Sequence, residues 1–214
     1  MIISFGRKYI FVHIPKTGGT ALTLALEERL MKDDLVIGDT PKAKQRRNKL
    51  KAYPKGRYWK HSTLKDIDPI VSADALDDFF LFGLVRNPWD RWASFYHWAL
   101  KQNFDHIQVQ LAQSLPFNDF IQHPIMVSVF KQNAYGSYFN DANGVERPAH
   151  FVRLEHLAND LQAVERHLGF SLGEIPKANA SDRDQDYHVY YNDAAKQTVA
   201  KHCAEDIDRF GYCF

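Results

Sequence analysis

The sequence predicts an α/β fold in which a central, mostly parallel sheet is flanked by helices on both faces. Short apolar runs rich in β-forming residues lie at residues 9–14, 79–85 and 150–154. Each run is followed by a turn and then by a segment with helical spacing of its apolar residues. Strands that alternate with helices favour parallel pairing, with the helices packed on the sheet. With 214 residues, the chain is expected to form a single domain over residues 1–214.

The elements follow one another in a regular order. The first strand, residues 9–14, ends at Pro15 and leads through a turn of small residues into a helix at residues 20–31. The second strand, residues 79–85, is apolar throughout and precedes a helix at residues 91–100, which Asp90 is placed to cap. The third strand, residues 150–154, leads into a helix at residues 156–168. Residues 178–191 predict a polar loop and residues 193–208 a final helix, and the aromatic tail at residues 210–214 is expected to pack on the core.

Composition narrows the class of protein. Hydrophobic residues make up 45% and charged residues 25%, which is typical of a globular protein and excludes a disordered chain. The net charge of +1 indicates no partner by itself. No apolar run reaches the roughly 18 residues of a membrane span, and the first residues lack the pattern of a signal peptide. Cys203 and Cys213 are the only cysteines, and we expect reduced thiols in a cytoplasmic protein.

The turn after the first strand has the composition of an anion-binding loop. Lys16 supplies a cation, Thr17 and Thr20 supply hydroxyls, and Gly18 and Gly19 permit close approach of the backbone. The free N–H groups and the dipole at the start of the following helix favour negative charge at the same place. The usual phosphate loop has its Lys after the glycines, whereas here Lys16 precedes them. In parallel sheets, ligands bind beyond the carboxyl ends of the strands, where this loop is expected.

At this point the sequence resembles a family. Residues 11–20, with the run P-K-T-G-G-T, are similar to the phosphosulfate-binding loop of sulfotransferases that use 3′-phosphoadenosine 5′-phosphosulfate (PAPS), in the branch that contains the carbohydrate sulfotransferases. The resemblance implies a P-loop-like fold and implies that the residues of this loop grip the 5′-phosphosulfate: Lys16, Thr17, Gly18, Gly19 and Thr20.

Further motifs extend the resemblance along the chain. Arg86 follows an apolar strand and Ser94 lies eight residues later, as in the family's second signature, which implies that both contact the 3′-phosphate. An Arg at a strand end offers several donors to a phosphate, although a salt bridge with Asp90 is the alternative role. Residues 151–160 match the family's F-x-R-x-E-x-L-x-x-D block, and the late N-x-S segment implies that Ser181 and Arg183 bind the nucleotide.

The implied chemistry is in-line attack of an acceptor oxygen or nitrogen on sulfur. Lys16 is placed to neutralise the charge that grows on the leaving phosphate, and no metal is expected because a sulfuryl group carries less charge than a phosphoryl group. A general base should take the acceptor's proton. His61 is the first candidate, because the short aromatic run at residues 58–59 predicts a strand that leads it to the ligand edge. His13 and a carboxylate such as Glu27 or Glu28 are the alternatives.

Only the charge pattern of the sequence gives information about the class of acceptor substrate. Residues 42–60 contain nine Lys or Arg and no acid, which leaves a net charge of −8 on the rest of the chain. The stretch is either a solvated flexible loop or a clamp for an anionic glycan, and it has no stacking motif for nucleic acid. We therefore expect a PAPS-dependent sulfotransferase that acts on a hydroxyl or amine of a carbohydrate acceptor, with no nucleic-acid or membrane partner. A small-molecule kinase of the phosphate-loop type and a non-catalytic module that binds anionic glycans or nucleotides are the rival functions.

Overall fold

The computed structural model of the chain describes residues 1–175 and 183–214. Their contacts group the chain into two compact units. The first unit comprises Met1–Val85 and Tyr135–Asn179, and the second comprises Arg86–Ala134 and Ala180–Phe214. Each unit has its own hydrophobic core. The assignment of one domain to residues 1–214 stays a prediction.

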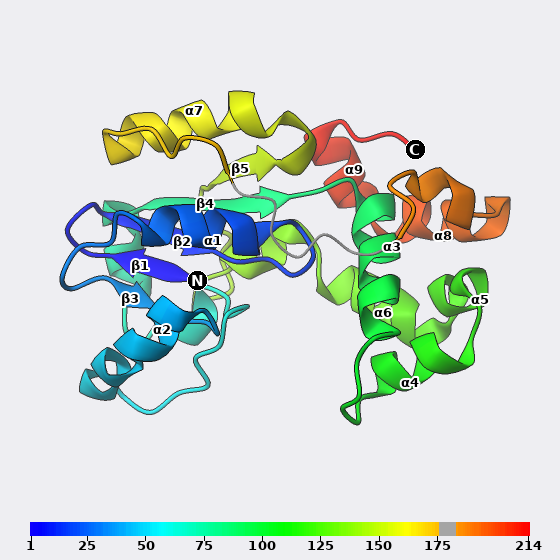
Figure 1. The fold of residues 1–214 in the computed structure, drawn as a ribbon, viewed down its shortest axis with the longest axis horizontal. Coiled ribbons are helices and arrows are strands. Elements are labelled where there is room, and N and C mark those ends of the chain that lie inside the picture. Colours follow the sequence, from blue (N-terminus) through cyan, green and yellow to red (C-terminus); the bar gives the residue numbers. More distant parts are fainter. Residues whose placement is uncertain (176–182) are drawn as a thin grey trace. The chain divides into compact units, whose positions relative to one another are not determined.

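The first unit is built on a five-stranded sheet (Figure 1). Its strands are β1 (Ile2–Ser4), β2 (Tyr9–Val12), β3 (Leu35–Val36), β4 (Phe80–Val85) and β5 (His150–Arg153). They lie in the order β3-β1-β2-β4-β5, with β2, β4 and β5 parallel and β1 antiparallel to both of its neighbours. The expected α/β class with parallel central strands is confirmed. The added strands β1 and β3 have only three and two residues, too few to show the alternation by which strands are predicted.

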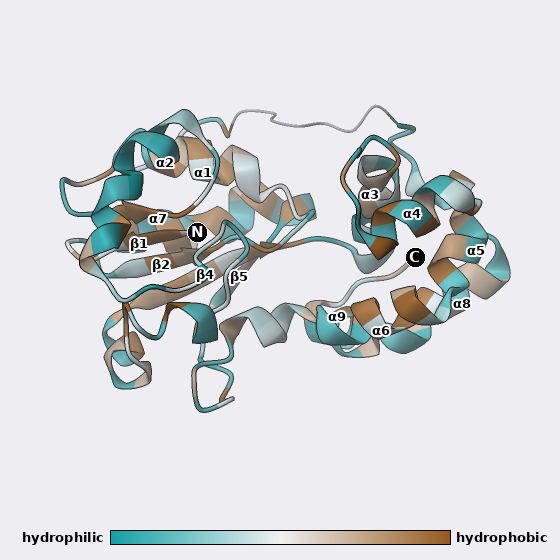
Figure 2. Ribbon diagram, turned by 90° about the horizontal axis from the view of Figure 1, so that it is seen from below, coloured by the Kyte–Doolittle hydropathy of each residue, from teal (hydrophilic) through white to brown (hydrophobic). Residues whose placement is uncertain are grey.

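One face of the sheet packs against three helices, α1 (Gly19–Glu27), α2 (Pro41–Arg46) and α7 (Leu157–Leu168). Alternate residues of each strand, such as Tyr9 and Phe11 on β2, point to this face and are fully or almost fully buried. They contact the apolar side of the helices, for example Leu22 on α1 and Val164 on α7. The strands are largely brown and α2 is largely teal in Figure 2, as expected for a buried sheet under a solvated helix.

On the other face, η4 (Tyr135–Phe139) packs against the sheet, and the unit also contains the 3₁₀ helices η2 (Lys65–Ile67) and η3 (Ala73–Asp78). The ring of Phe139 lies 4.9 Å from that of Phe151 on β5. A Cβ on Gly83 of β4 would lie 3.0 Å from the same Phe139 ring and 2.9 Å from the carbonyl oxygen of Val12. The glycine within the otherwise apolar run 79–85 therefore makes room for Phe139.

The second unit is helical. It contains α3 (Pro88–Ala99), α4 (Ile107–Ser114), α5 (Phe117–Gln122), α6 (Pro124–Gln132), η6 (Tyr187–Tyr190), α8 (Asp193–His202) and α9 (Ala204–Phe210). Buried aromatic side chains dominate its core, with the rings of Trp92 and Phe130 4.4 Å apart. As expected, the tail packs on this core, because the Phe214 ring lies 5.6 Å from the rings of both Trp89 and Tyr191.

Three local predictions are wrong, and one alternative left open by the sequence is excluded for part of its range. The single helix expected at residues 193–208 is divided at Cys203, which is buried and ends α8 with a ψ of 20°. Residues 58–59 form no strand. Of the two alternatives for residues 42–60, the flexible loop does not describe the first part of the stretch, which lies in α2 and then η1 (Arg47–Ala52), because Thr40 caps α2 and Pro41 stands at its first position. Helix α3 is capped by Asn87 instead of Asp90.

Two further features concern the environment of the chain. Cys203 and Cys213 both carry free thiols, the first buried and the second exposed. Within residues 1–175 and 183–214, none of the helices is both long enough and apolar enough to cross a membrane. The cytoplasmic location expected from the sequence stays a prediction.

Candidate functional site

The loop between β2 and α1 presents a helix start without a side-chain cap. Gly18 occupies the cap position of α1 with a left-handed φ of 86°, and no described side chain accepts a hydrogen bond from the first N–H groups of the helix. The first turn of α1 also contains no acidic residue. Unsatisfied N–H groups and the positive end of the helix dipole together favour an anion at this place.

Lys16 holds the most unusual backbone conformation in this loop. Its φ of 66° lies in the left-handed region, where a side chain with a Cβ costs roughly 1–2 kcal/mol. Thr17 is buried, and its hydroxyl donates a hydrogen bond of 2.9 Å to the carbonyl of Ile14. The hydroxyl therefore closes the turn in which Lys16 is held. Strained backbone that the surrounding structure maintains is common at functional sites.

Both glycines of the loop are required by close neighbours. A Cβ on Gly18 would lie 3.0 Å from the side chain of Leu154, the residue that follows β5. A Cβ on Gly19 would lie 2.3 Å from Cδ2 of His13, closer than real Cβ contacts. The imidazole of His13 therefore occupies the space that a larger residue at the start of α1 would need.

His61 lies beside this loop through its contact with His13. Nδ1 of His61 is 2.7 Å from the carbonyl oxygen of His13, and the two rings are 4.9 Å apart. Because a carbonyl only accepts, Nδ1 carries the hydrogen and Nε2 of neutral His61 carries the free electron pair. Burial lowers the pKa of His61 to about 4 and that of His13 well below its ordinary value. Both imidazoles are therefore neutral at pH 7.

The second motif that the sequence predicts to bind an anion follows β4, the parallel neighbour of β2. Arg86 directly follows Val85, the last residue of β4, and its guanidinium is bound by Asp90, with Nε 2.7 Å and Nη2 2.5 Å from Oδ2. The other carboxylate oxygen of Asp90 accepts a hydrogen bond from Nη2 of Arg183. The structure thus brings Arg86 and Arg183 together around one carboxylate.

Ser94 is buried on α3, four residues after Asp90 and therefore on the same side of the helix. Its hydroxyl makes none of the hydrogen bonds found among the described residues. Ser181, expected to bind the nucleotide, lies outside the described residues.

The sequence interpretation missed one residue that organises the second motif, Asn87, and one contact, the bridge from Asp90 to Arg183. Asn87 caps α3 by accepting a hydrogen bond from the N–H of Trp89, and its side-chain amide donates to the Tyr187 hydroxyl and to the Cys213 carbonyl. Asp90 was expected as a cap or as an alternative partner of Arg86, and the bridge to Arg183 was not expected. The four-residue spacing of Arg86 and Asp90 was the available signal.

The block at residues 151–160 has a structural role. Arg153, at the end of β5, forms a two-pronged ion pair with Asp160 on α7, at 2.8 Å from Nε to Oδ2 and 3.0 Å from Nη2 to Oδ1. These hydrogen bonds lower the pKa of Asp160. The pair joins the end of β5 to the start of α7.

The cations of the basic stretch fall into two groups. Some bind nearby oxygens: Lys42 binds the Glu28 carboxylate at 3.0 Å, Arg46 donates to the Met31 carbonyl at 2.8 Å, and Lys60 binds Asp39 at 2.7 Å. Others are exposed, and their side chains make no hydrogen bond or ion pair among the described residues: Lys44, Arg47, Lys51 and Lys55. Part of the basic stretch is therefore held to the first unit by its own cations, whereas the remaining cations are exposed to solvent.

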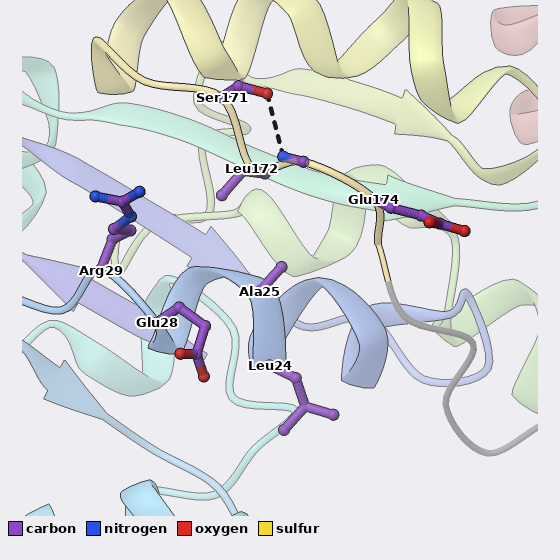
Figure 3. Close-up of a pocket in the computed structure, with 8 residues that line it drawn as sticks. Leu24, Ala25, Glu28, Arg29, Ser171, Leu172 and Glu174 are labelled. Atoms are coloured by element: carbon purple, nitrogen blue, oxygen red, sulfur yellow. Dashed lines mark hydrogen bonds between the residues drawn. The ribbon is translucent and has the colours of Figure 1, made fainter.

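A hollow of about 460 Å³ lies on the second half of α1, away from the glycine loop (Figure 3). Leu24, Ala25 and Leu172 line it together with the carboxylates of Glu28 and Glu174. Arg29 also lines it, so two acidic residues and one cation leave no surplus of positive charge for a phosphate group there. Among the described residues, no cluster of three or more His, Cys, Asp or Glu side chains could hold a metal ion, and independence of metal stays a prediction.

Comparison with known proteins identifies the family. The model of the sulfotransferase family matches residues 1–212. The crystal structure of mouse sulfotransferase SULT7A1 complexed with PAP is similar in fold, with a TM-score of 0.56 and 16% sequence identity over 96% of this chain and 85% of that chain. No curated protein matches the chain. The family match confirms the prediction of a sulfotransferase, and the structural likeness confirms the fold class.

Proposed function

The chain belongs to the sulfotransferase family, and from that premise we propose that it transfers a sulfuryl group from PAPS to a hydroxyl or amine of a carbohydrate acceptor. Lys16 precedes α1, and Gly18 and Gly19 pack closely against their neighbours. The observation that carries this proposal is the start of this helix, which has no side-chain cap. It offers N–H donors and a cation to one anionic group, as the 5′-phosphosulfate requires. The PAP in the structurally similar mouse enzyme supports the choice of nucleotide.

Lys16 is proposed as the main electrostatic catalyst. During in-line attack, negative charge grows on the oxygen that bridges sulfur and the leaving phosphate. A cation held in a fixed backbone conformation stabilises that charge without having to reorganise. The left-handed φ of Lys16 and the turn closed by Thr17 provide this fixed conformation. The N–H groups of Gly19 and Thr20 at the start of α1 are proposed to bind the same phosphosulfate.

The 3′-phosphate is assigned to the second motif. Arg86 and Arg183 supply guanidinium groups, and Ser94 supplies a hydroxyl on the same side of α3 as Asp90. Guanidinium forks suit phosphate oxygens because they offer several donors in one plane. This phosphate is remote from sulfur, so these residues should control affinity for the nucleotide more than the rate of transfer.

His61 is proposed as the general base. Its hydrogen bond to His13 leaves the electron pair on Nε2, as a base requires, and its lowered pKa of about 4 keeps it unprotonated at pH 7. The wrong prediction of a strand at residues 58–59 does not remove His61 from the loop, because the contact with His13 holds it there. His13 is the weaker candidate, because its ring is 6% exposed and lies against Gly19.

An anionic glycan is the proposed acceptor class. The exposed cations on α2, η1 and the segment that follows form a surface without a carboxylate between residues 42 and 60. The Trp59 ring, 45% exposed, lies under the guanidinium of Arg57 at 5.7 Å from its carbon. Exposed cations beside an exposed aromatic ring suit the charges and the apolar face of a sugar chain.

Isothermal titration with PAPS and with ATP, each with and without Mg²⁺, tests the nucleotide assignment. We expect tight binding of PAPS in the absence of metal and weak binding of ATP. Preference for ATP with Mg²⁺ would instead support a kinase. Transfer of labelled sulfate from PAPS to a panel of sulfated, carboxylated and neutral oligosaccharides would then test the acceptor class, and equal transfer to charged and neutral glycans would contradict it.

A further inference from the structure

Asp90 stands at the centre of the second motif although it cannot itself bind an anion. Its carboxylate side chain is 16% exposed, and each oxygen is bound to a different guanidinium. Arg86 approaches Oδ2 with two nitrogens, at 2.5 Å and 2.7 Å, and Arg183 approaches Oδ1 with Nη2. The side chain of Arg183 is only 1% exposed. Two cations from segments about a hundred residues apart are therefore held next to each other by one carboxylate.

Without this carboxylate the arrangement would be unstable. Two guanidiniums that share one carboxylate are near enough for strong mutual repulsion, which partial burial increases. The carboxylate offsets that repulsion and restricts the plane of Arg86, because Nε and Nη2 of the guanidinium both contact the same oxygen, Oδ2. The cluster of two cations and one anion keeps a net charge of +1, which still attracts a phosphate.

The segment that carries Arg183 is fastened to the same end of α3 by further contacts. The Tyr187 hydroxyl accepts a hydrogen bond of 3.1 Å from the side-chain amide of Asn87. The Tyr191 hydroxyl donates one of 2.8 Å to the carbonyl of Trp89. These contacts define the path of residues 187–191, whereas the guanidinium of Arg183 is oriented by the ion pair of Nη2 with Asp90 and by a hydrogen bond of 2.9 Å from Nη1 to the carbonyl of Asp184. Removal of the Asp90 charge should therefore change this orientation without releasing the whole segment.

We propose that Asp90 is a positioning residue that gives the enzyme its selectivity for a 3′-phosphorylated nucleotide, because it holds the Arg86 and Arg183 guanidiniums in one fixed anion-binding arrangement. This inference rests on the proposed function, since it takes the 3′-phosphate as the ligand. A different role is conceivable on electrostatic grounds. If Asp90 merely competed with the phosphate for the guanidiniums, its removal would strengthen binding instead of weakening it.

The test compares PAP with AMP, which lacks the 3′-phosphate, as competitive inhibitors of the wild-type enzyme and of Asp90→Asn. Asparagine keeps the size of the side chain and removes the charge. We expect the wild type to prefer PAP and the variant to lose about tenfold of that preference, with AMP binding little changed. Asp90→Glu, which keeps the charge, should retain more of the preference. Asp160→Asn, which breaks the comparable ion pair with Arg153, is the matched control and should leave the ratio unchanged.

The outcomes separate the inference from the proposed function. If the wild type prefers PAP and Asp90→Asn keeps the same ratio or binds PAP more tightly, the positioning role is wrong while the nucleotide assignment stands. If the wild type shows no preference for PAP over AMP, the proposed function fails and the inference fails with it. Should Asp90→Asn not fold, Asp90→Ser, which also removes the charge, takes its place: a loss of the preference for PAP would support the role, and an unchanged ratio would contradict it.

Discussion

Replacement of Gly19 by alanine should destabilise the protein, although alanine is the better helix former. Gly19 is the first residue of α1, and a Cβ there would lie 2.3 Å from Cδ2 and 2.6 Å from Nε2 of the His13 ring. The ring cannot easily move away. It is 6% exposed and lies 4.9 Å from the His61 ring and 5.9 Å from the Phe11 ring. The alanine methyl group therefore forces either His13 or the start of the helix to shift.

The expected loss follows from two opposing terms. Alanine in a helix interior is favoured over glycine by about 1 kcal/mol, and less at the first position. Insertion of a methyl group into a packed site costs about 1–3 kcal/mol. We expect a net decrease of about 1–2 kcal/mol in the free energy of unfolding, or about 2–8 °C in melting temperature for a chain of this size.

Thermal and urea unfolding of Gly19→Ala measure this change, and Gly38→Ala is the matched control. A Cβ on Gly38 would meet only ordinary contacts, 3.8 Å from Ala43 and from Lys60. The control should therefore change the free energy of unfolding by less than about 0.5 kcal/mol, as for a substitution away from special features. An increase in the stability of Gly19→Ala would refute the reasoning, because it would show that helix propensity outweighs the contact with His13.

Three further variants, two single and one quadruple, test the proposed chemistry. Lys16→Gly should lower kcat by about two orders of magnitude or more. The melting temperature should not fall, because glycine tolerates the left-handed φ at this position. An unchanged kcat would show that Lys16 has no catalytic role. His61→Ala should lower kcat by about 10²–10⁴. The wild-type base is protonated, and loses its free electron pair, as the pH falls through a pKa of about 4. The acidic limb of the wild-type pH–rate profile should therefore lie near this pKa of about 4, and it should vanish in the variant. A variant profile that keeps this limb would point to His13 as the base. Four cations of the basic stretch are exposed: Lys44, Arg47, Lys51 and Lys55. Neutralising all four together should raise the acceptor KM and flatten its salt dependence without changing the Kd of PAPS. An unchanged acceptor KM would show that they have no role in acceptor binding.

The central strands β2 and β4 could be predicted because they are apolar along their whole length, and the edge strand β5 could be predicted from Phe151 and Val152 between His150 and Arg153. Each of β2, β4 and β5 lies within a run that was recognised from composition alone, and each is followed by a helix as the alternation requires. Helix α2 was missed because its six residues, Pro41–Arg46, are mostly charged, and charge is equally typical of a loop. The capping residue Thr40 with the following Pro41 was the local signal that distinguishes the two.

For the candidate site, the sequence indicates which residues take part but not which residues contact one another. The sequence identifies Lys16, Arg86 and Ser94 because motifs are sets of residue types at fixed spacing. Residues that contact each other from distant segments have no fixed spacing in the sequence, so no motif reveals the contact. His61 meets His13 across 48 residues, and Arg183 meets Asp90 across 93 residues. Yet these contacts decide which nitrogen of an imidazole can accept a proton and how two guanidiniums are oriented toward one anion. The sequence thus indicates which chemistry the residues can perform, whereas protonation state and orientation, on which rate and selectivity depend, follow only from the folded neighbourhood.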